Sequence, residues 1–289
     1  MGERLPALPT FTYQNAASVS RFRDADALAR QEADAESIGR LGMLYHAYQF
    51  HDEARTSYAL ARELAPEEFR WLYYSAMLEK ITFAYEAAES LFQRALVLRP
   101  ADAELWAQLG DLYLMWSRRE EARDHLDRAL ELDTVQPVAA VGVARLLSLE
   151  QDWGLVVATM KPLLERHPRL SKAHQFMAAA YGALGEGELQ AAHIEAGEYG
   201  SAVASDLMNE LNELAVPAIL EGDPAPGPEL LQAKCARCHT HERIYDHDED
   251  RRWWARTVRR MQREAGWQWL TDDEAASVVA YLDERKLSD

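Results

Sequence analysis

Apolar and small side chains return at a fixed spacing between residue 35 and about residue 200. Pro66 and Pro100 are separated by 34 residues, and Pro168 follows after a further 68. Two further columns keep the same spacing, one of small side chains and one of large ones: Ala54, Ala88 and Ala122 in the first, and Tyr58, Phe92, Leu126 and Met160 in the second. A 34-residue period with such columns predicts pairs of antiparallel helices that stack on one another.

This period resembles that of the tetratricopeptide repeat. Five units are expected, and they begin near Ala35, Phe69, Ala103, Pro137 and Ser171. The resemblance implies an all-α fold in which the pairs stack into a right-handed superhelix, because one pair cannot bury its apolar face alone. The second unit departs from the pattern, since Glu79 stands where a tyrosine is expected, and the fifth unit loses register after its glycine-rich turn.

By the same resemblance, the first helices of the units line a concave groove that binds a peptide or a protein surface. The expected lining is mixed and partly apolar: Met43, His46, Tyr73, Met77, Leu114, Val141 and Arg145. It lacks the Asn and Lys set with which a chaperone-type groove clamps a C-terminal carboxylate. The expected partner is therefore a folded redox protein or a subunit of a membrane complex.

The segments outside residues 35–200 have other signatures. Residues 1–34 are predicted to form an N-terminal extension with a helix over 24–33. Residues 201–227 are expected to contain a helix over 205–220 that caps the open end of the repeats, followed by a stiff linker rich in proline and glycine. Residues 228–289 are then predicted to form a separate small domain.

Cys235 and Cys238 are the only cysteines of the chain, and His239 follows them directly. This spacing suits covalent haem attachment, in which both sulfurs form thioethers and the imidazole becomes the proximal iron ligand. A thioredoxin-like redox pair is one alternative, but no βαβ pattern surrounds the run. A zinc site that recruits His239, His241 or His247 is another, although a second Cys-x-x-Cys is missing.

The segment that follows resembles a small class I c-type cytochrome domain, of the kind found in haem subunits of periplasmic dehydrogenases and in reaction-centre cytochromes. This domain would hold a single haem c. The resemblance makes Met261 the distal iron ligand, with His241 and His247 as alternatives that would give a bis-histidine haem. Four apolar side chains are expected to pack on the haem: Trp254, Val258, Tyr281 and Leu282.

Helical spacing supports two helices in this domain. The first reads as helical over 253–261; its apolar residues Trp254, Val258, Met261 and Ala265 form one stripe, and the arginines Arg252, Arg256, Arg259 and Arg263 fall on the other side. These arginines are expected either to form a docking rim or to pair with the acidic repeats. A capping box of Thr271 and Glu274 starts the second helix.

Charge is shared unevenly along the chain. The 48 acidic and 31 basic residues give a net charge of −17, and residues 228–289, with 11 basic and 13 acidic residues, account for only −2 of it. The acidic repeats argue against binding to nucleic acid or to anionic lipid, and they favour a small basic electron carrier among the partners. No apolar run is long enough to span a membrane.

A haem with protein ligands on both faces passes single electrons and does not bind substrate at iron. The sequence therefore predicts a non-enzymatic periplasmic cytochrome, docked through its repeats onto a larger redox or photosynthetic complex. Covalent attachment occurs outside the bacterial cytoplasm, and no export signal is visible at the first residues, so a removed leader or anchor is expected. Two other hypotheses remain: an assembly scaffold whose haem is structural or redox-sensing, and a haem sensor or enzyme with an open sixth site.

Overall fold

The structure is a computed structural model that describes residues 4–198, 206–220, 227–235, 244 and 249–285. The described residues form helices and connecting turns, with no strand among them, so the predicted all-α class is confirmed. By its contacts the chain divides into two compact units. Unit 1 contains residues 1–74 and 206–289, and unit 2 contains residues 75–205. No helix in the described part has both the length and the hydropathy that a bilayer span requires.

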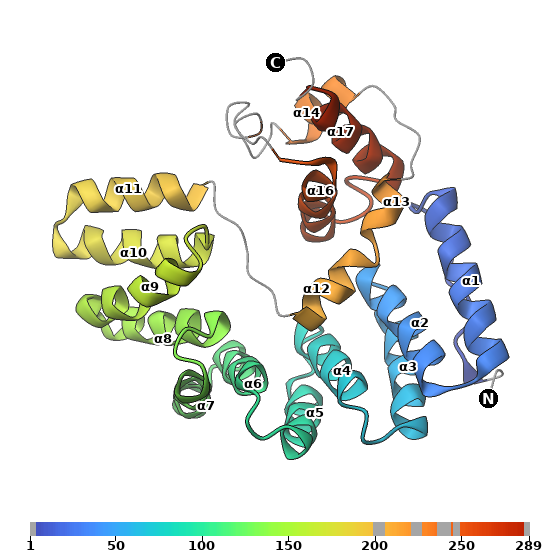
Figure 1. The fold of residues 1–289 in the computed structure, drawn as a ribbon, viewed down its shortest axis with the longest axis horizontal. Helices are drawn as coiled ribbons and strands as arrows, with labels where there is room; N and C mark the ends of the chain where they lie inside the picture. Colours follow the sequence, from blue (N-terminus) through green and yellow to red (C-terminus); the bar gives the residue numbers. More distant parts are fainter. Residues whose placement is uncertain (1–3, 199–205, 221–226, 236–243, 245–248, 286–289) are drawn as a thin grey trace. The chain divides into compact units, whose positions relative to one another are not determined.

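The five predicted helix pairs are present, in the order that Figure 1 shows. Their first helices start at the five predicted residues: α2 (Ala35–Ala47), α4 (Phe69–Ile81), α6 (Ala103–Met115), α8 (Pro137–Glu150) and α10 (Ser171–Leu184). The second helices are α3 (His51–Leu64), α5 (Tyr85–Leu98), α7 (Arg119–Leu132), α9 (Trp153–Arg166) and α11 (Gly187–Glu198).

Turn geometry repeats with the sequence. One residue between the two helices of each pair has a positive φ, and these residues follow one another at the repeat interval: Gln49 at 62°, Phe83 at 62°, Ser117 at 64°, Gln151 at 61° and Gly185 at 80°. Only the fifth is a glycine. The other four turns hold a side chain in the left-handed region, at a cost of about 1 kcal/mol each that the helix packing must offset.

The column of large side chains forms the contact between successive pairs. Its first four members, Tyr58, Phe92, Leu126 and Met160, are completely buried. Leu126 shows why the neighbouring positions must be small: a Cβ atom at Gly110 would lie 2.7 Å from the Leu126 side chain, and one at Gly142 would lie 2.9 Å from it. Leu126 therefore fills the space left by one glycine on its own pair and one on the next.

Unit 1 packs the first repeat with helices from both ends of the chain. The N-terminal helix α1 (Ala16–Glu32) is longer than predicted, because the Asn15 side chain caps it by accepting a hydrogen bond from the Ser18 N–H at 2.9 Å. The C-terminal helices of this unit are α12 (Asp206–Glu213), α13 (Val216–Leu220), α14 (Gly227–Lys234), α16 (Arg251–Ala265) and α17 (Asp272–Arg285).

Helix α12 packs against α2 of the first repeat. The Tyr74 hydroxyl lies 2.9 Å from the Leu207 carbonyl oxygen and 3.0 Å from a Glu210 carboxylate oxygen, and it donates to them. The helix that the sequence assigned to the end of the repeats thus lies on the first repeat instead. Its polar residues explain the difference, because Glu210 and the carbonyl of Leu207 find a donor on α4 there.

Burial controls the charge of His46 in α2. This side chain is 5% exposed, and its Nδ1 lies 3.3 Å from the Tyr58 hydroxyl. Burial, reinforced by repulsion from His51 and Arg263, lowers the pKa of His46 to about 3. His46 is therefore still neutral in the folded protein in the pH range where a histidine of the unfolded chain takes up a proton.

We expect Gly110→Ala to destabilise unit 2, although alanine favours a helix by about 1 kcal/mol over glycine. The new methyl group meets Leu126, and overpacking of this kind costs about 1–3 kcal/mol. Gly187→Ala is the matched control in the same unit, because a Cβ atom there meets nothing within 4 Å. Urea denaturation should show a lower free energy of unfolding for the first variant and an equal or higher one for the second. Equal effects would contradict the packing described above.

We expect acid to destabilise the protein through His46. The unfolded chain binds a proton near the ordinary histidine pKa and the folded chain does not, so stability falls as pH drops below that value. The loss amounts to about 2 kcal/mol between about pH 7 and about pH 5. His46→Gln should remove this part of the pH dependence in urea denaturation curves. An unchanged slope in the variant would mean that another group causes the acid sensitivity.

Candidate functional site

Cys235 directly follows α14, and it is the member of the predicted attachment run that the structure describes. Lys234 ties this end of α14 to the start of α17: its Nζ donates to the Glu274 carboxylate at 2.6 and 2.7 Å and to the Trp269 carbonyl at 2.5 Å. Burial alone would raise the pKa of Glu274, but the bonds and the charge of Lys234 outweigh it and lower that pKa. The backbone of Cys235 is therefore anchored by an ion pair.

The side chain of Cys235 is buried in an apolar cluster contributed by α13, α14, α16 and α17. Trp254, Val258 and Leu282 are buried members of the same cluster, and Tyr281 packs against it half-buried. The other buried members are Val216, Ile219, Leu231, Ile244, Ala255, Leu270, Ala275, Ala276, Val278 and Val279. The structure thus brings a thiol together with the four side chains that the sequence assigned to haem packing.

This environment fits a covalently held haem in its chemistry. The macrocycle is large and apolar, and it attaches through cysteine sulfur. A buried thiol in one apolar cluster with Trp254, against which Tyr281 also packs, meets both requirements. The remaining predicted ligands, Cys238 and His239, and the alternatives His241 and His247, lie outside the described residues.

The buried face of α16 differs from the predicted stripe. Its buried residues are Trp254, Ala255, Val258, Arg259 and Gln262. Met261 is half-buried at the edge of this face, three residues beyond Val258, and Ala265 is exposed. The face is rotated because Arg259 and Gln262 both bond to a buried carboxylate of α17, which outweighs the burial of two apolar side chains.

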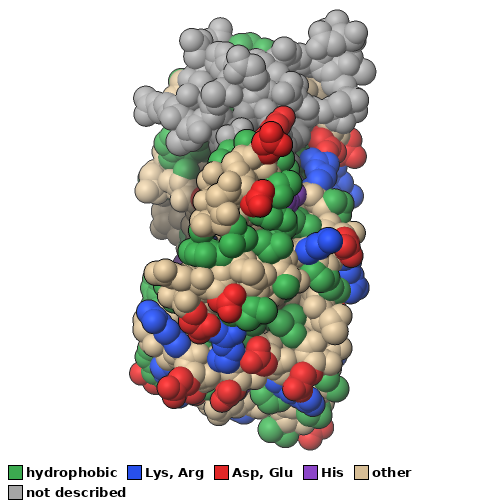
Figure 2. Space-filling model, turned by 90° about the vertical axis from the view of Figure 1, so that its left-hand side faces the viewer, with side chains coloured by type: hydrophobic (Ala, Val, Ile, Leu, Met, Phe, Trp, Pro, Cys, Tyr) green, Lys and Arg blue, Asp and Glu red, His purple; other side chains and the backbone are tan. Residues whose placement is uncertain are grey.

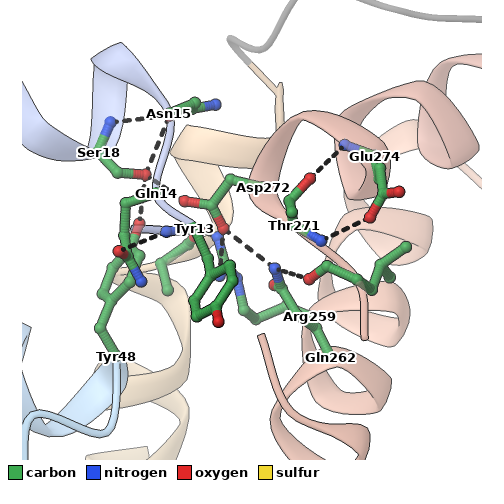
Figure 3. Close-up of polar contacts among 12 residues, drawn as sticks. Tyr13, Gln14, Asn15, Ser18, Tyr48, Arg259, Gln262, Thr271, Asp272 and Glu274 are labelled. Atoms are coloured by element: carbon green, nitrogen blue, oxygen red, sulfur yellow. Dashed lines mark hydrogen bonds and ion pairs between the residues drawn. The ribbon is translucent and has the colours of Figure 1, made fainter. Parts of the chain in front are cut away.

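That carboxylate belongs to Asp272, which is completely buried (Figure 3). Its Oδ1 accepts from Arg259 at 3.0 Å and from Gln262 at 3.1 Å, and its Oδ2 accepts from the Ser18 hydroxyl at 2.6 Å. The Asp272 backbone N–H donates to the Tyr13 carbonyl at 3.2 Å. One side chain and its own amide therefore connect the N-terminal segment, α1, α16 and α17.

Arg259 has further partners besides Asp272. It donates to the Ala215 carbonyl at 2.6 Å, and its guanidinium lies 5.0 Å from the Tyr48 ring centroid and 5.6 Å from that of Trp267. Burial raises the pKa of Tyr48, so its hydroxyl keeps the proton that it can share with Ser18, 3.1 Å away. The arrangement compensates a buried cation with one carboxylate, one carbonyl and two aromatic rings.

The predicted arginine rim is therefore wrong for Arg259, which is 1% exposed. The other three arginines bind α12. Arg252 lies 2.8 Å from Glu213, Arg256 pairs with the same carboxylate, and Arg263 donates to the Asn212 side chain at 2.5 Å. These side chains hold α16 against α12 within unit 1, so the arginines of α16 mainly serve the fold.

The predicted capping box at the start of α17 is confirmed. The Thr271 N–H donates to Glu274 at 2.9 Å, and the Glu274 N–H donates to the Thr271 hydroxyl at 3.3 Å. Glu274 also accepts from Lys234, so one carboxylate starts α17 and anchors the residue before Cys235. Figure 3 shows Thr271 and Glu274 beside the Asp272 contacts.

The seven predicted groove residues are mostly covered by protein. Five are buried and lie in the packed helices: Met43, His46, Tyr73, Met77 and Leu114. Val141 is half-buried and Arg145 is exposed. Solvent therefore reaches the predicted lining mainly on α8.

Sequence reasoning missed the residues that orient the site. Lys234 carried no visible signal, because a lysine just before a cysteine has no pattern of its own. The capping-box pattern gives Asp272 no role of its own, and its burial follows from contacts with Tyr13 and Ser18, near the other end of the chain. No local pattern predicts a contact of that range.

Comparison with known proteins supports both parts of this description. Residues 225–288 match the haem-binding domain of the quinohemoprotein amine dehydrogenase alpha subunit family. Two solved structures share the repeat fold. A tetratricopeptide repeat protein from Parabacteroides merdae is 20% identical, with a TM-score of 0.53 over 70% of this chain and 84% of that one. PilF from Pseudomonas aeruginosa is 16% identical, with a TM-score of 0.54 over 61% and 81%. No curated protein matches the chain.

We expect Asp272→Ala to lower the free energy of unfolding by about 3–5 kcal/mol, because it leaves the buried Arg259 guanidinium without its counter-charge. Arg259→Met combined with Asp272→Ala should cost less than the sum of the two single changes. Arg252→Met on the same helix is the control, since its ion pair with Glu213 is largely exposed and contributes at most about 1 kcal/mol. Chemical denaturation of all four variants measures these differences, and additive single effects would show that the two residues act independently.

Proposed function

We propose that residues 228–289 form a class I c-type cytochrome domain that carries one covalently bound haem. Cys235 and Cys238 would form the thioethers, and His239 would be the proximal iron ligand. The observation that carries the proposal is the burial of Cys235 in the same apolar cluster as Trp254 and Leu282, within the segment that matches a haem-binding family. When bound, the haem supplies one-electron oxidation and reduction of its iron.

The residues around Cys235 would then orient the prosthetic group and keep water from it. Lys234 and Glu274 fix the end of α14, so the thiol has little freedom to move. Trp254, Val258 and Leu282 would offer an apolar wall, and the low dielectric of such a wall helps to set the reduction potential of the iron. Met261, half-buried at the edge of α16, would be the distal ligand.

We propose further that the chain is an electron-transfer protein and that its repeats bind a protein partner. Helical repeats of this fold present broad surfaces to other proteins, which supports a docking role. The partner would be a larger redox complex, and a small basic carrier would exchange electrons with the haem, since the chain has a net charge of −17. Covalent haem attachment would place the mature protein in the periplasm.

One observation favours a second candidate function. Ser18 and Tyr13 bind Asp272, so the haem-binding segment is integrated into the same compact unit as the first repeat. A rigid connection of this kind suits an assembly scaffold in which haem is structural or senses redox state. Fast electron exchange with a soluble carrier would favour the electron-transfer protein, and partner binding that is independent of redox state would favour the scaffold.

We expect Met261→Ala, in protein matured by a host that attaches c-type haem, to abolish the weak long-wavelength methionine–iron band of the oxidised spectrum. The same variant should bind carbon monoxide when reduced, because its sixth position is open. Met115→Ala is the control, since this methionine is also half-buried but belongs to unit 2. The native protein should show a sharp reduced α-band and no response to carbon monoxide.

Three results would change this assignment. A native spectrum that responds to carbon monoxide would make the protein a haem sensor or enzyme. A Met261→Ala spectrum identical to the native one would make a histidine the distal ligand. Absence of haem after maturation would assign Cys235 and Cys238 to zinc or a disulfide, and the scaffold function would remain.

A further inference from the structure

The fifth repeat exposes the position that every earlier repeat buries. Ile194 continues the column of Tyr58, Phe92, Leu126 and Met160 at the same repeat interval. Those four side chains are 0% exposed, whereas Ile194 is 51% exposed. Because all five occupy equivalent positions on the second helix of a pair, the exposure of Ile194 marks a helix-packing surface that no described helix of unit 2 covers.

The earlier repeats show what covers this position. Leu126 meets Gly142, and Tyr58 stacks on Tyr74 with ring centroids 6.1 Å apart. Each partner comes sixteen residues after the side chain that it covers, on the first helix of the following pair. A ligand of Ile194 would therefore be a helix that crosses α11 with a small or flat side chain at the contact.

The chain itself contains a helix at this distance from Ile194, namely α12, but α12 packs on the first repeat. Glu210 stands at this same offset after Ile194 and belongs to α12. In unit 1, α12 packs on α2, and Tyr74 and Arg263 bond to Glu210 and Asn212. A helix from another molecule is thus the occupant that remains for α11.

Charge on α11 selects among such helices. Glu188 and Glu195 are exposed and two helical turns apart, so they lie in one row, about 100° around the helix from Ile194. Figure 2, which faces the side of the chain that carries α9–α11, shows hydrophobic side chains next to acidic ones on this surface. A second copy would bring two such acidic rows together around a two-fold axis, which like-charge repulsion opposes. A basic helix avoids that repulsion.

We propose that the exposed face of α11, centred on Ile194 and bordered by Glu188 and Glu195, binds an amphipathic helix of a partner protein whose apolar stripe is flanked by lysine or arginine. The inference rests on the proposed docking role of the repeats and names the surface that performs it. It does not depend on haem. The concave groove predicted from the sequence is a different surface, on the first helices of the pairs.

A peptide derived from α8 is a suitable probe, because α8 covers the equivalent position of the third repeat. Residues Leu146, Leu149 and Glu150 of α8 line a shallow pocket together with Glu120 of α7, and Glu120 is the equivalent of Glu188 two repeats earlier. A peptide of residues 137–150 with Leu149→Lys and Glu150→Lys would therefore place two cations beside Glu188. Its matched counterpart carries Leu149→Glu and leaves Glu150 in place.

Binding of the fluorescent peptides to the full-length protein would be measured by anisotropy. We expect the lysine peptide to bind at least about tenfold more tightly than the glutamate peptide, and Ile194→Glu to weaken it about tenfold. Leu155→Glu is the control, because Leu155 is equally exposed on α9, where Met160 is already covered. It should change the affinity by less than about twofold.

Glu188→Lys keeps Ile194 intact and tests charge alone. It should weaken the lysine peptide and strengthen the glutamate peptide, a reversal that misfolding cannot produce. The proposal is overturned if the two peptides bind equally, if neither binds, or if Ile194→Glu has no effect. It is also overturned if sedimentation shows a dimer that Ile194→Glu dissociates, because the occupant is then a second copy. If the protein acquires no haem on maturation but still binds the lysine peptide, the electron-transfer function is rejected and the docking surface on α11 is retained.

Discussion

A carboxylate that has lost its water must obtain every bond from the protein, and Asp272 obtains them from both ends of the chain. Arg259 and Gln262 come from α16, Ser18 comes from α1, and the backbone of Tyr13 receives the Asp272 amide. The apolar cluster around Cys235 lies partly on α16 and α17, the two helices whose relative orientation this carboxylate sets. The geometry of the candidate haem site thus depends on residues near the N-terminus. Buried ion pairs add little net stability, so the contribution of this one is to make a single arrangement of the helices favourable.

The repeats could be predicted from the sequence in detail, because each unit needs small and large side chains at the same positions in order to pack its helices. The starts of α2, α4, α6, α8 and α10 follow from the repeat period, and the full burial of Leu126 and its equivalents follows from the columns. The exposure of Ile194 also follows from that period once it is known that α12, the next helix in register, packs on the first repeat. The position of α12 could not be predicted, since its register suits the end of the repeats and its contacts with Tyr74 and Arg263 are set by tertiary structure.

The candidate site divides in the same way. The chemistry proposed for Cys235, Cys238 and His239 rests on their spacing, since thioether and imidazole ligands of one haem would have to be close in sequence. The amphipathic character of α16 was also legible, but its rotation was not. Arg259 and Gln262 take the place of Met261 and Ala265 on the buried face because both donate to the buried carboxylate of Asp272 on α17. Patterns of hydrophobicity treat arginine as exposed, and they fail where a distant residue supplies its counter-charge.

Unit 1 has a consequence for the order in which the protein matures. Ser18 and Asp272 are 254 residues apart, so the N-terminal helices must wait for the end of the chain before they can make their final contacts. Residues 75–205 form a continuous segment and can fold while the rest is still being delivered. Contacts at such long sequence separation form slowly. Under the proposed function, an attachment enzyme would have to reach the Cys235 thiol before unit 1 closes, because the closed unit buries it.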